Sequence, residues 1–188
     1  FKKLSYDDAE YPHEVRKIEA RLLPFLDICQ QHHTPLRPGV NHGPPSHRIM
    51  SRFGSTPEGI VESCMEFLRV CRKADFTDVV LSVKASNTVV MVRSVRLLVE
   101  AMDREDMHFP LHLGVTEAGE GEDGRVRSAV GIGALLTEGL GDTIRVSLSE
   151  EPECEIPVAR KLVSFIPECA SLRRTAPIED GVMRLSLD

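Results

Sequence analysis

The stretch that decides the fold is a strand, a helix and a second strand in direct succession. It reads FTDVVLSVKAS over residues 76–86, NTVVMVRSVRLLVEAMDRED over 87–106 and FPLHLGVTEAG over 109–119. The outer two segments alternate apolar with polar or small residues, which predicts strands, whereas the middle segment has the longer apolar period of a helix. Two strands joined by a helix of this length are expected to run parallel in one sheet.

The same unit occurs four times along the chain. Strands are expected to begin near Leu36, Asp78, Phe109 and Thr143, each followed by a helical pattern. Two architectures have this alternation: an open doubly wound sheet, and a barrel whose complete form needs roughly 250 residues. Each strand here has one apolar and one mostly polar face, whereas a sheet covered by helices on both sides is apolar on both. The sequence therefore predicts an α/β fold with four βα units that form half of a TIM barrel.

Composition excludes several classes of partner. With 41% hydrophobic and 28% charged residues the chain is predicted to be soluble and globular, and its net charge of −6 argues against nucleic acid. No apolar run approaches the ~20 residues that span a membrane. An odd number of cysteines without metal-site spacing indicates a reducing compartment. They are Cys29, Cys64, Cys71, Cys154 and Cys169.

The polar faces of three strands each carry a cation. Arg37, Lys84 and Arg145 share the same phase of alternation and are expected at the carboxyl ends of neighbouring strands, where barrel enzymes keep their sites. Such cations repel one another unless an anion neutralises them, and guanidinium and ammonium groups suit phosphate. We therefore expect a small ligand with more than one phosphate charge. The candidate binding residues are Arg37, Asn41, Lys84, Ser86, His112, Arg145 and Ser147.

Three of these candidate residues also have a purely structural interpretation. Lys84 could extend to solvent, and Arg145 could form an ion pair with Glu117 or Asp142. His112 could be a hydrogen-bonded histidine of the core. A standard nucleotide-binding loop is not expected, because neither GxGxxG nor GxxxxGK[ST] occurs.

Five blocks of sequence together resemble the 4-hydroxy-3-methylbut-2-enyl diphosphate synthases. The similarity extends from Phe1 to about Pro157. The blocks are GVNHG (39–43), RIMSRFGSTPEGIVES (48–63), SVKASN (82–87), PLHLGVTEAGEGEDGR (110–125) and SAVGIGALLTEGLGDTIRVSLS (128–149).

The resemblance implies an iron-sulfur oxidoreductase of the methylerythritol phosphate route to isoprenoids. Its barrel binds the cyclic diphosphate, and a separate C-terminal domain holds a [4Fe-4S] cluster through three cysteines and a glutamate. These ligands are expected outside this chain. Ferredoxin or flavodoxin is the implied electron donor, a homodimer is one expected assembly, and the implied location is the bacterial cytoplasm or the plastid stroma.

The resemblance also implies residue roles. Arg37, Asn41, Lys84, Arg145 and Ser147 match motif positions that anchor the diphosphate. Glu117 matches the glutamate of the TEAG motif, which faces the substrate carbon skeleton and is our candidate catalytic residue. The sequence departs from the family pattern at Arg37-Pro38-Gly39 and at Pro44-Pro45-Ser46.

The resemblance further implies a division of the chain into two parts. Residues 1–157 would be the second, C-terminal half of the barrel, and 158–188 the last barrel helix and the start of an inserted domain, as in the three-domain plant-like form. The 188 residues alone are therefore expected to be inactive. Two other functions stay open: a Schiff-base or phosphosugar lyase that uses Lys84, and a non-catalytic barrel fragment.

Overall fold

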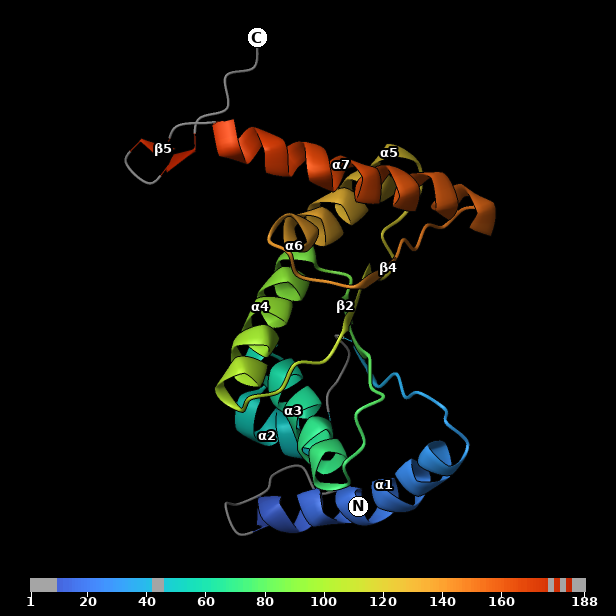
Figure 1. Ribbon diagram of the computed structural model, residues 1–188, viewed down its shortest axis with the longest axis vertical. Helices are drawn as coiled ribbons and strands as arrows, with labels where there is room; N and C mark the ends of the chain where they lie inside the picture. The colour runs from blue at the N-terminus through green and yellow to red at the C-terminus, as the bar shows by residue number, and fades with distance from the viewer. Residues whose placement is uncertain (1–9, 42–45, 176–177, 180–181, 184–188) are drawn as a thin grey trace.

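The computed structural model describes residues 10–41, 46–175, 178–179 and 182–183. Within them, helices and strands alternate as expected (Figure 1). The strands are β1 Gly39–Asn41, β2 Leu81–Ala85, β3 Leu111–Val115, β4 Thr143–Arg145, and the short pair β5 Ile178–Glu179 and β6 Val182–Met183. The helices are α1 Glu10–Gln31, α2 His47–Phe53, α3 Pro57–Lys73, α4 Thr88–Arg104, α5 Gly121–Ser128, the π-helical turn η1 Ala129–Gly133, α6 Ala134–Thr137, the 3-10 turn η2 Pro152–Cys154 and α7 Glu155–Thr175.

The four main strands form one parallel sheet in the order β1-β2-β3-β4. Each strand therefore pairs with its neighbour in sequence, and the order never reverses. A doubly wound sheet must reverse its order at a switch point, whereas a barrel keeps sequential order around its circumference. This topology confirms the prediction of half a barrel.

Helices cover one face of the sheet. Figure 1 shows α3, α4 and α6 stacked along one side, with α1 and α7 at the two ends of the arc. Leu81 and Val83 of β2 and Leu113 of β3 are each 1% exposed and belong to the core beneath these helices. Gly131 of η1 lets the helix approach β3, because a Cβ there would lie 2.5 Å from Cγ2 of Val115.

Helices α3 and α4 each begin with a side-chain cap. The Thr56 hydroxyl accepts a hydrogen bond from the amide of Gly59, at 3.2 Å, at the start of α3. The Asn87 side chain accepts one from the amide of Val90, at 3.0 Å, at the start of α4. Both caps satisfy amides that have no partner inside the helix.

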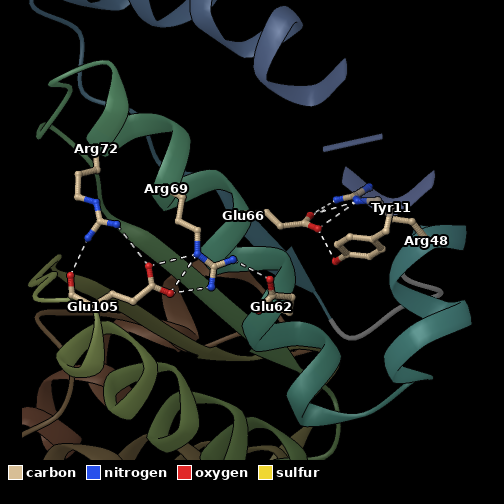
Figure 2. Close-up of polar contacts among 7 residues, drawn as sticks. All are labelled: Tyr11, Arg48, Glu62, Glu66, Arg69, Arg72 and Glu105. Atoms are coloured by element: carbon tan, nitrogen blue, oxygen red, sulfur yellow. Dashed lines mark hydrogen bonds and ion pairs between the residues drawn. The ribbon is translucent and has the colours of Figure 1, made fainter. Parts of the chain in front are cut away.

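A buried carboxylate joins the three helices at the N-terminal end of the arc (Figure 2). Glu66 of α3 accepts hydrogen bonds from the guanidinium of Arg48 in α2 and, at 2.5 Å, from the hydroxyl of Tyr11 in α1. Burial and the bond to Glu66 raise the pKa of Tyr11, so this hydroxyl stays protonated. A second network links α3 to the end of α4, where Arg69 binds Glu62 and Glu105.

The structure differs from the sequence prediction in local extent. The strands are shorter than expected: β2 and β3 begin at Leu81 and Leu111, and Leu36 contributes only an isolated bridge to Val79. Helix α2 was not predicted, and α7 continues to Thr175.

Two further expectations concern the division of the chain and the proline loop. The boundary predicted after residue 157 falls in the first turn of α7, and the division into two parts stays a prediction. The Pro44-Pro45 departure lies outside the described residues. No helix in the described ranges combines the length and apolar character needed to cross a membrane.

Candidate active site

The carboxyl ends of the strands bring Lys84 and Arg145 together, whereas Arg37 lies at the amino end of β1, so the prediction that it lies at a carboxyl end was wrong. Asn41 pairs with Lys84, Lys84 with Gly114, and Gly114 with Arg145, so these positions form one row across the sheet. Because side chains in one row of a parallel sheet point to the same face, Lys84 and Arg145 project from the same side. Arg37 precedes β1 by two residues and is exposed. We call Arg37, Lys84 and Arg145 the cation triad.

The members of the cation triad influence one another electrostatically. Partial burial, then Arg145, then Arg37 lower the pKa of Lys84. Within the described part of the chain, no carboxylate forms an ion pair with Lys84 or Arg145. Asp142, one of the two partners considered for Arg145, instead accepts a hydrogen bond from the Leu111 amide at 2.8 Å. A cluster of like charges without a carboxylate partner favours the binding of an anion.

The absence of a side chain at Gly114 leaves room for the side chain of Lys84. A Cβ at Gly114 would lie 3.3 Å from Cε of Lys84 and 3.0 Å from the carbonyl oxygen of Arg145. The lysine stem therefore crosses over the bare backbone of β3 toward β4. A side chain at position 114 would displace the stem and separate the two charges.

A second row on the same face lies two residues closer to the amino ends of the strands. It contains Gly39, Ser82, His112 and Thr143. Nδ1 of His112 lies 2.8 Å from the hydroxyl of Thr143, whereas Nε2 is buried and has no hydrogen-bond partner among the described residues. Burial, then Lys84, Arg37 and Arg145, lower the pKa of His112. A neutral imidazole with one free nitrogen thus lies below the cation triad.

Glu117 lies two residues beyond the end of β3 and is exposed. Its φ of 53° is in the left-handed region, which is costly for a residue with a long side chain. The loop that carries it is attached to the chain after β4, because the amide of Ser149 donates to the carbonyl of Gly119 at 3.0 Å.

The remaining predicted residues lie at the same edge. Ser86 is exposed one residue beyond β2, and Ser147 is half-buried two residues beyond β4. Asn41 is the last residue of β1, and its position in the register is all that the structure gives. The structure thus places most predicted site residues at the carboxyl edge of one sheet, whereas His112 lies near the start of β3 and Arg37 lies before the start of β1. Their roles stay predictions.

Comparison with known proteins decides the family. The family model described as the GcpE TIM-barrel domain matches residues 12–160. The chain belongs to the GcpE TIM-barrel domain family. The fold is accordingly half of a TIM barrel, with four βα units.

Several relatives of this GcpE domain are similar over most of its length. It is 66% identical over 182 residues to the 4-hydroxy-3-methylbut-2-en-1-yl diphosphate synthase (flavodoxin) of Bacteroides fragilis, covering 97% of this chain and 28% of that protein. A protein of the same name from Bacteroides thetaiotaomicron is 70% identical over 166 residues, 88% of this chain and 27% of its own. The chloroplastic 4-hydroxy-3-methylbut-2-en-1-yl diphosphate synthase (ferredoxin) of Oryza sativa subsp. japonica is 51% identical over 181 residues, 96% of this chain and 24% of its own. The chain therefore spans about a quarter of the length of these curated relatives.

The described residues of this GcpE domain do not fit an iron-sulfur cluster. They contain no group of three or more histidine, cysteine, aspartate or glutamate side chains placed to hold a metal ion. Cys29, Cys64 and Cys71 are buried free thiols, and burial raises the pKa of Cys64 to about 12. Cluster ligation needs thiolates. Any cluster that acts with this domain must be held by other residues.

Sequence reasoning missed three residues that shape the site. Thr143 has the same phase as Arg145 and could have been found from the alternation of β4. Arg125 and Glu150 form a bidentate ion pair with N–O distances of 2.6 and 2.9 Å. Arg125 lies in the short helix α5 and Glu150 lies in the loop after β4, so no common period links the two positions.

Proposed function

We propose that this GcpE domain anchors the diphosphate in the reductive opening of 2-C-methyl-D-erythritol 2,4-cyclodiphosphate to 4-hydroxy-3-methylbut-2-enyl diphosphate. The observation that carries the proposal is the cation triad, in which both arginines lower the pKa of Lys84 and which has no carboxylate partner among the described residues. A cyclic diphosphate supplies the negative charge that this arrangement lacks. The names of the relatives support the reaction assigned to the whole protein.

The proposed roles follow from position. Arg37, Lys84 and Arg145 hold the phosphate oxygens, and Asn41, Ser86 and Ser147 add neutral donors. His112 offers a hydrogen-bonding nitrogen at the floor of the site. Glu117 is the one carboxylate of the set, so it faces the carbon skeleton away from the phosphates and handles protons.

The chemistry requires two electrons from outside this chain. A carbon–oxygen bond to phosphate breaks, so that the cyclic diphosphate becomes linear, and one hydroxyl leaves as water. We propose that a [4Fe-4S] cluster elsewhere in the polypeptide delivers the electrons, with flavodoxin or ferredoxin as donor. The bacterial cytoplasm or the plastid stroma is the proposed location.

The experiment is anaerobic turnover of the cyclic diphosphate by the full-length polypeptide with dithionite as reductant. Truncating a charged hydrogen-bond partner costs about 2 kcal/mol or more. We therefore expect Lys84→Ala to raise KM roughly thirtyfold. The matched control is Lys73→Ala, which removes a lysine at the C-terminal end of α3, where its ion pair with Glu19 is exposed.

The possible results separate the two parts of the proposal. If Lys84→Ala has the parent's KM, the cation triad does not anchor the substrate. If the full-length parent fails to turn over the cyclic diphosphate, the proposed reaction is wrong.

A lyase with a Schiff-base lysine is a second candidate, because the lowered pKa of Lys84 increases its fraction of free amine. Borohydride reduction in the presence of a phosphosugar carbonyl compound tests it. Covalent labelling of Lys84 would favour the lyase, and its absence at saturating compound would exclude it. The three clustered cations favour the diphosphate function.

A further inference from the structure

Two loops at the carboxyl edge are joined by a charged clamp that the proposed reaction does not use directly. We call residues 116–120 the Glu117 loop and residues 146–151 the β4 loop. The first carries the candidate catalytic carboxylate, and the second follows Arg145 and contains Ser147. The strands before them are neighbours in the sheet, but a shared sheet edge does not by itself fix the loops.

The clamp is centred on Glu150. Its Oε1 accepts a hydrogen bond from the amide of Gly121 at 2.7 Å, directly after the Glu117 loop. Both of its oxygens bind the guanidinium of Arg125 in α5, at 2.6 and 2.9 Å. Arg125 also donates to the carbonyl of Gly121 at 2.7 Å. One carboxylate therefore holds the residue after the Glu117 loop through both its amide and its neighbouring arginine.

Backbone contacts and close packing support the same junction. The amide of Ser149 donates to the carbonyl of Gly119. A Cβ at Gly124 would lie 2.6 Å from the oxygen of Gly119 and 2.8 Å from Cδ2 of Leu148. Helix α5 thus starts in contact with both loops, and little space separates them.

Glu117 needs such support because of its backbone conformation. The other described non-glycine residues with positive φ are His33, Asp75 and Asp106, each two residues beyond the end of a helix. Residues just after a helix commonly take this conformation. Glu117 instead follows a strand, where the surrounding contacts must maintain it.

We propose that Glu150 is a positioning residue that fixes the Glu117 loop and thereby sets the place of Glu117 relative to Arg145 and Ser147. The inference rests on the proposed function, since it links the carboxylate at the carbon skeleton to the strand end that holds the diphosphate. Glu150 acts through Gly121 and Arg125 and does not contact the substrate. Arg125 and the Gly121 amide lower the pKa of Glu150 to about 2, so the clamp is charged at every working pH.

The kinetic test compares Glu150→Ala, Glu150→Gln and Arg125→Ala in the full-length enzyme. Misplacing a catalytic group is costly, and we expect Glu150→Ala to lower kcat about tenfold. KM for the cyclic diphosphate stays within about twofold, because the cation triad is untouched. Glutamine can still accept from the Gly121 amide, and Arg125→Ala keeps that bond too, so both should lose less kcat than Glu150→Ala.

The matched control is Glu58→Ala, which removes a carboxylate from an exposed ion pair with Arg93 on the covering helices. It should leave kcat and KM at parental values. A parental kcat in Glu150→Ala would overturn the proposal. So would a loss confined to KM, because that result would place Glu150 in diphosphate binding.

A second readout does not depend on turnover. Glu150→Ala removes the acceptor of the Gly121 amide, so amide hydrogen exchange in a peptide covering residues 117–124 should become faster, whereas Glu58→Ala should not change it. Unchanged exchange in Glu150→Ala would overturn the clamp. If the parent lacks turnover yet the exchange responds, the proposed reaction fails while the clamp stands.

Discussion

At the scale of single residues, His112 is the most sensitive reporter of the site's charge. It is 6% exposed, and Lys84, Arg37 and Arg145 all lower its pKa, with no described carboxylate in an ion pair with Lys84 or Arg145. A proton on this ring adds a fourth positive charge to the same face. The folded protein therefore rejects a proton that the unfolded chain, with a histidine pKa near 6.5, accepts.

This difference predicts an acid-sensitive stability. In the window from the lowered pKa of His112 up to about 6.5, the unfolded state binds more protons than the folded state, so stability falls as the pH falls. The unfolding midpoint of the full-length protein should thus drop between pH 7 and pH 5, and less steeply in His112→Gln. Pyrophosphate should reduce the drop, because a bound anion offsets the cations. Parallel pH profiles for the parent and His112→Gln would contradict the prediction.

The contrast between Lys84 and Glu150 shows which residues of the site could be predicted from the sequence. A strand has a fixed period of two, so the phase of Lys84, His112 and Arg145 could be predicted from alternation alone. Glu150 binds Arg125 across 25 residues, from the loop after β4 to helix α5. Loops have no period, and only the folded chain reveals such a pair.

At the scale of elements, the carboxylate of Glu66 is what ties α1 and α2 to α3. Its side chain is 2% exposed, and that of Arg48 is 13% exposed. A buried ion pair contributes little beyond what its desolvation costs, but removing one partner leaves an uncompensated charge. The tie matters for the site because α2 and α3 follow β1, the strand that ends in Asn41.

We expect Glu66→Ala to lower the free energy of unfolding by about 3 kcal/mol, because Arg48 and the Tyr11 hydroxyl lose their shared acceptor. Urea unfolding of the full-length protein, followed by a probe within the barrel, measures the change. The control Glu58→Ala breaks an exposed pair and should cost about 1 kcal/mol or less. Equal losses in the two variants would show that the buried cluster does not hold the helices.

The same elements show what local pattern misses. Helices α3 and α4 could be predicted because each has a capping residue and several turns of apolar stripe. Helix α2 spans only His47–Phe53, too short for a stripe to be distinct. Gly131 packs closely against Val115, whereas a Cβ at Gly133 would meet nothing within 4 Å. The two glycines look alike in sequence and differ only in what lies opposite them.

At the scale of the whole molecule, the half-barrel leaves surfaces that a closed barrel covers. Among the described strands, β1 and β4 each pair on one side only within the main sheet. The helices at the two ends of the arc expose large apolar side chains: Phe25 is 48% and Ile28 55% exposed on α1, and Phe165 is 52% exposed on α7. Unpaired strand edges and apolar patches of this kind favour association with another chain.

The division of labour within the barrel leads to the last prediction, that the 188 residues alone bind an anion but do not turn over. The whole cation triad lies in this half, so isothermal titration should detect pyrophosphate, more weakly than in the full-length protein, and Lys84→Ala should abolish the signal. Light scattering should show self-association that increases with concentration, because the open edges pair.

No reduction of the cyclic diphosphate is expected with dithionite, since the described residues cannot ligate a cluster. Turnover by the isolated chain would refute the assignment of the redox centre to other residues. Absence of pyrophosphate binding would instead show that the cation triad needs the other half of the barrel to become a site.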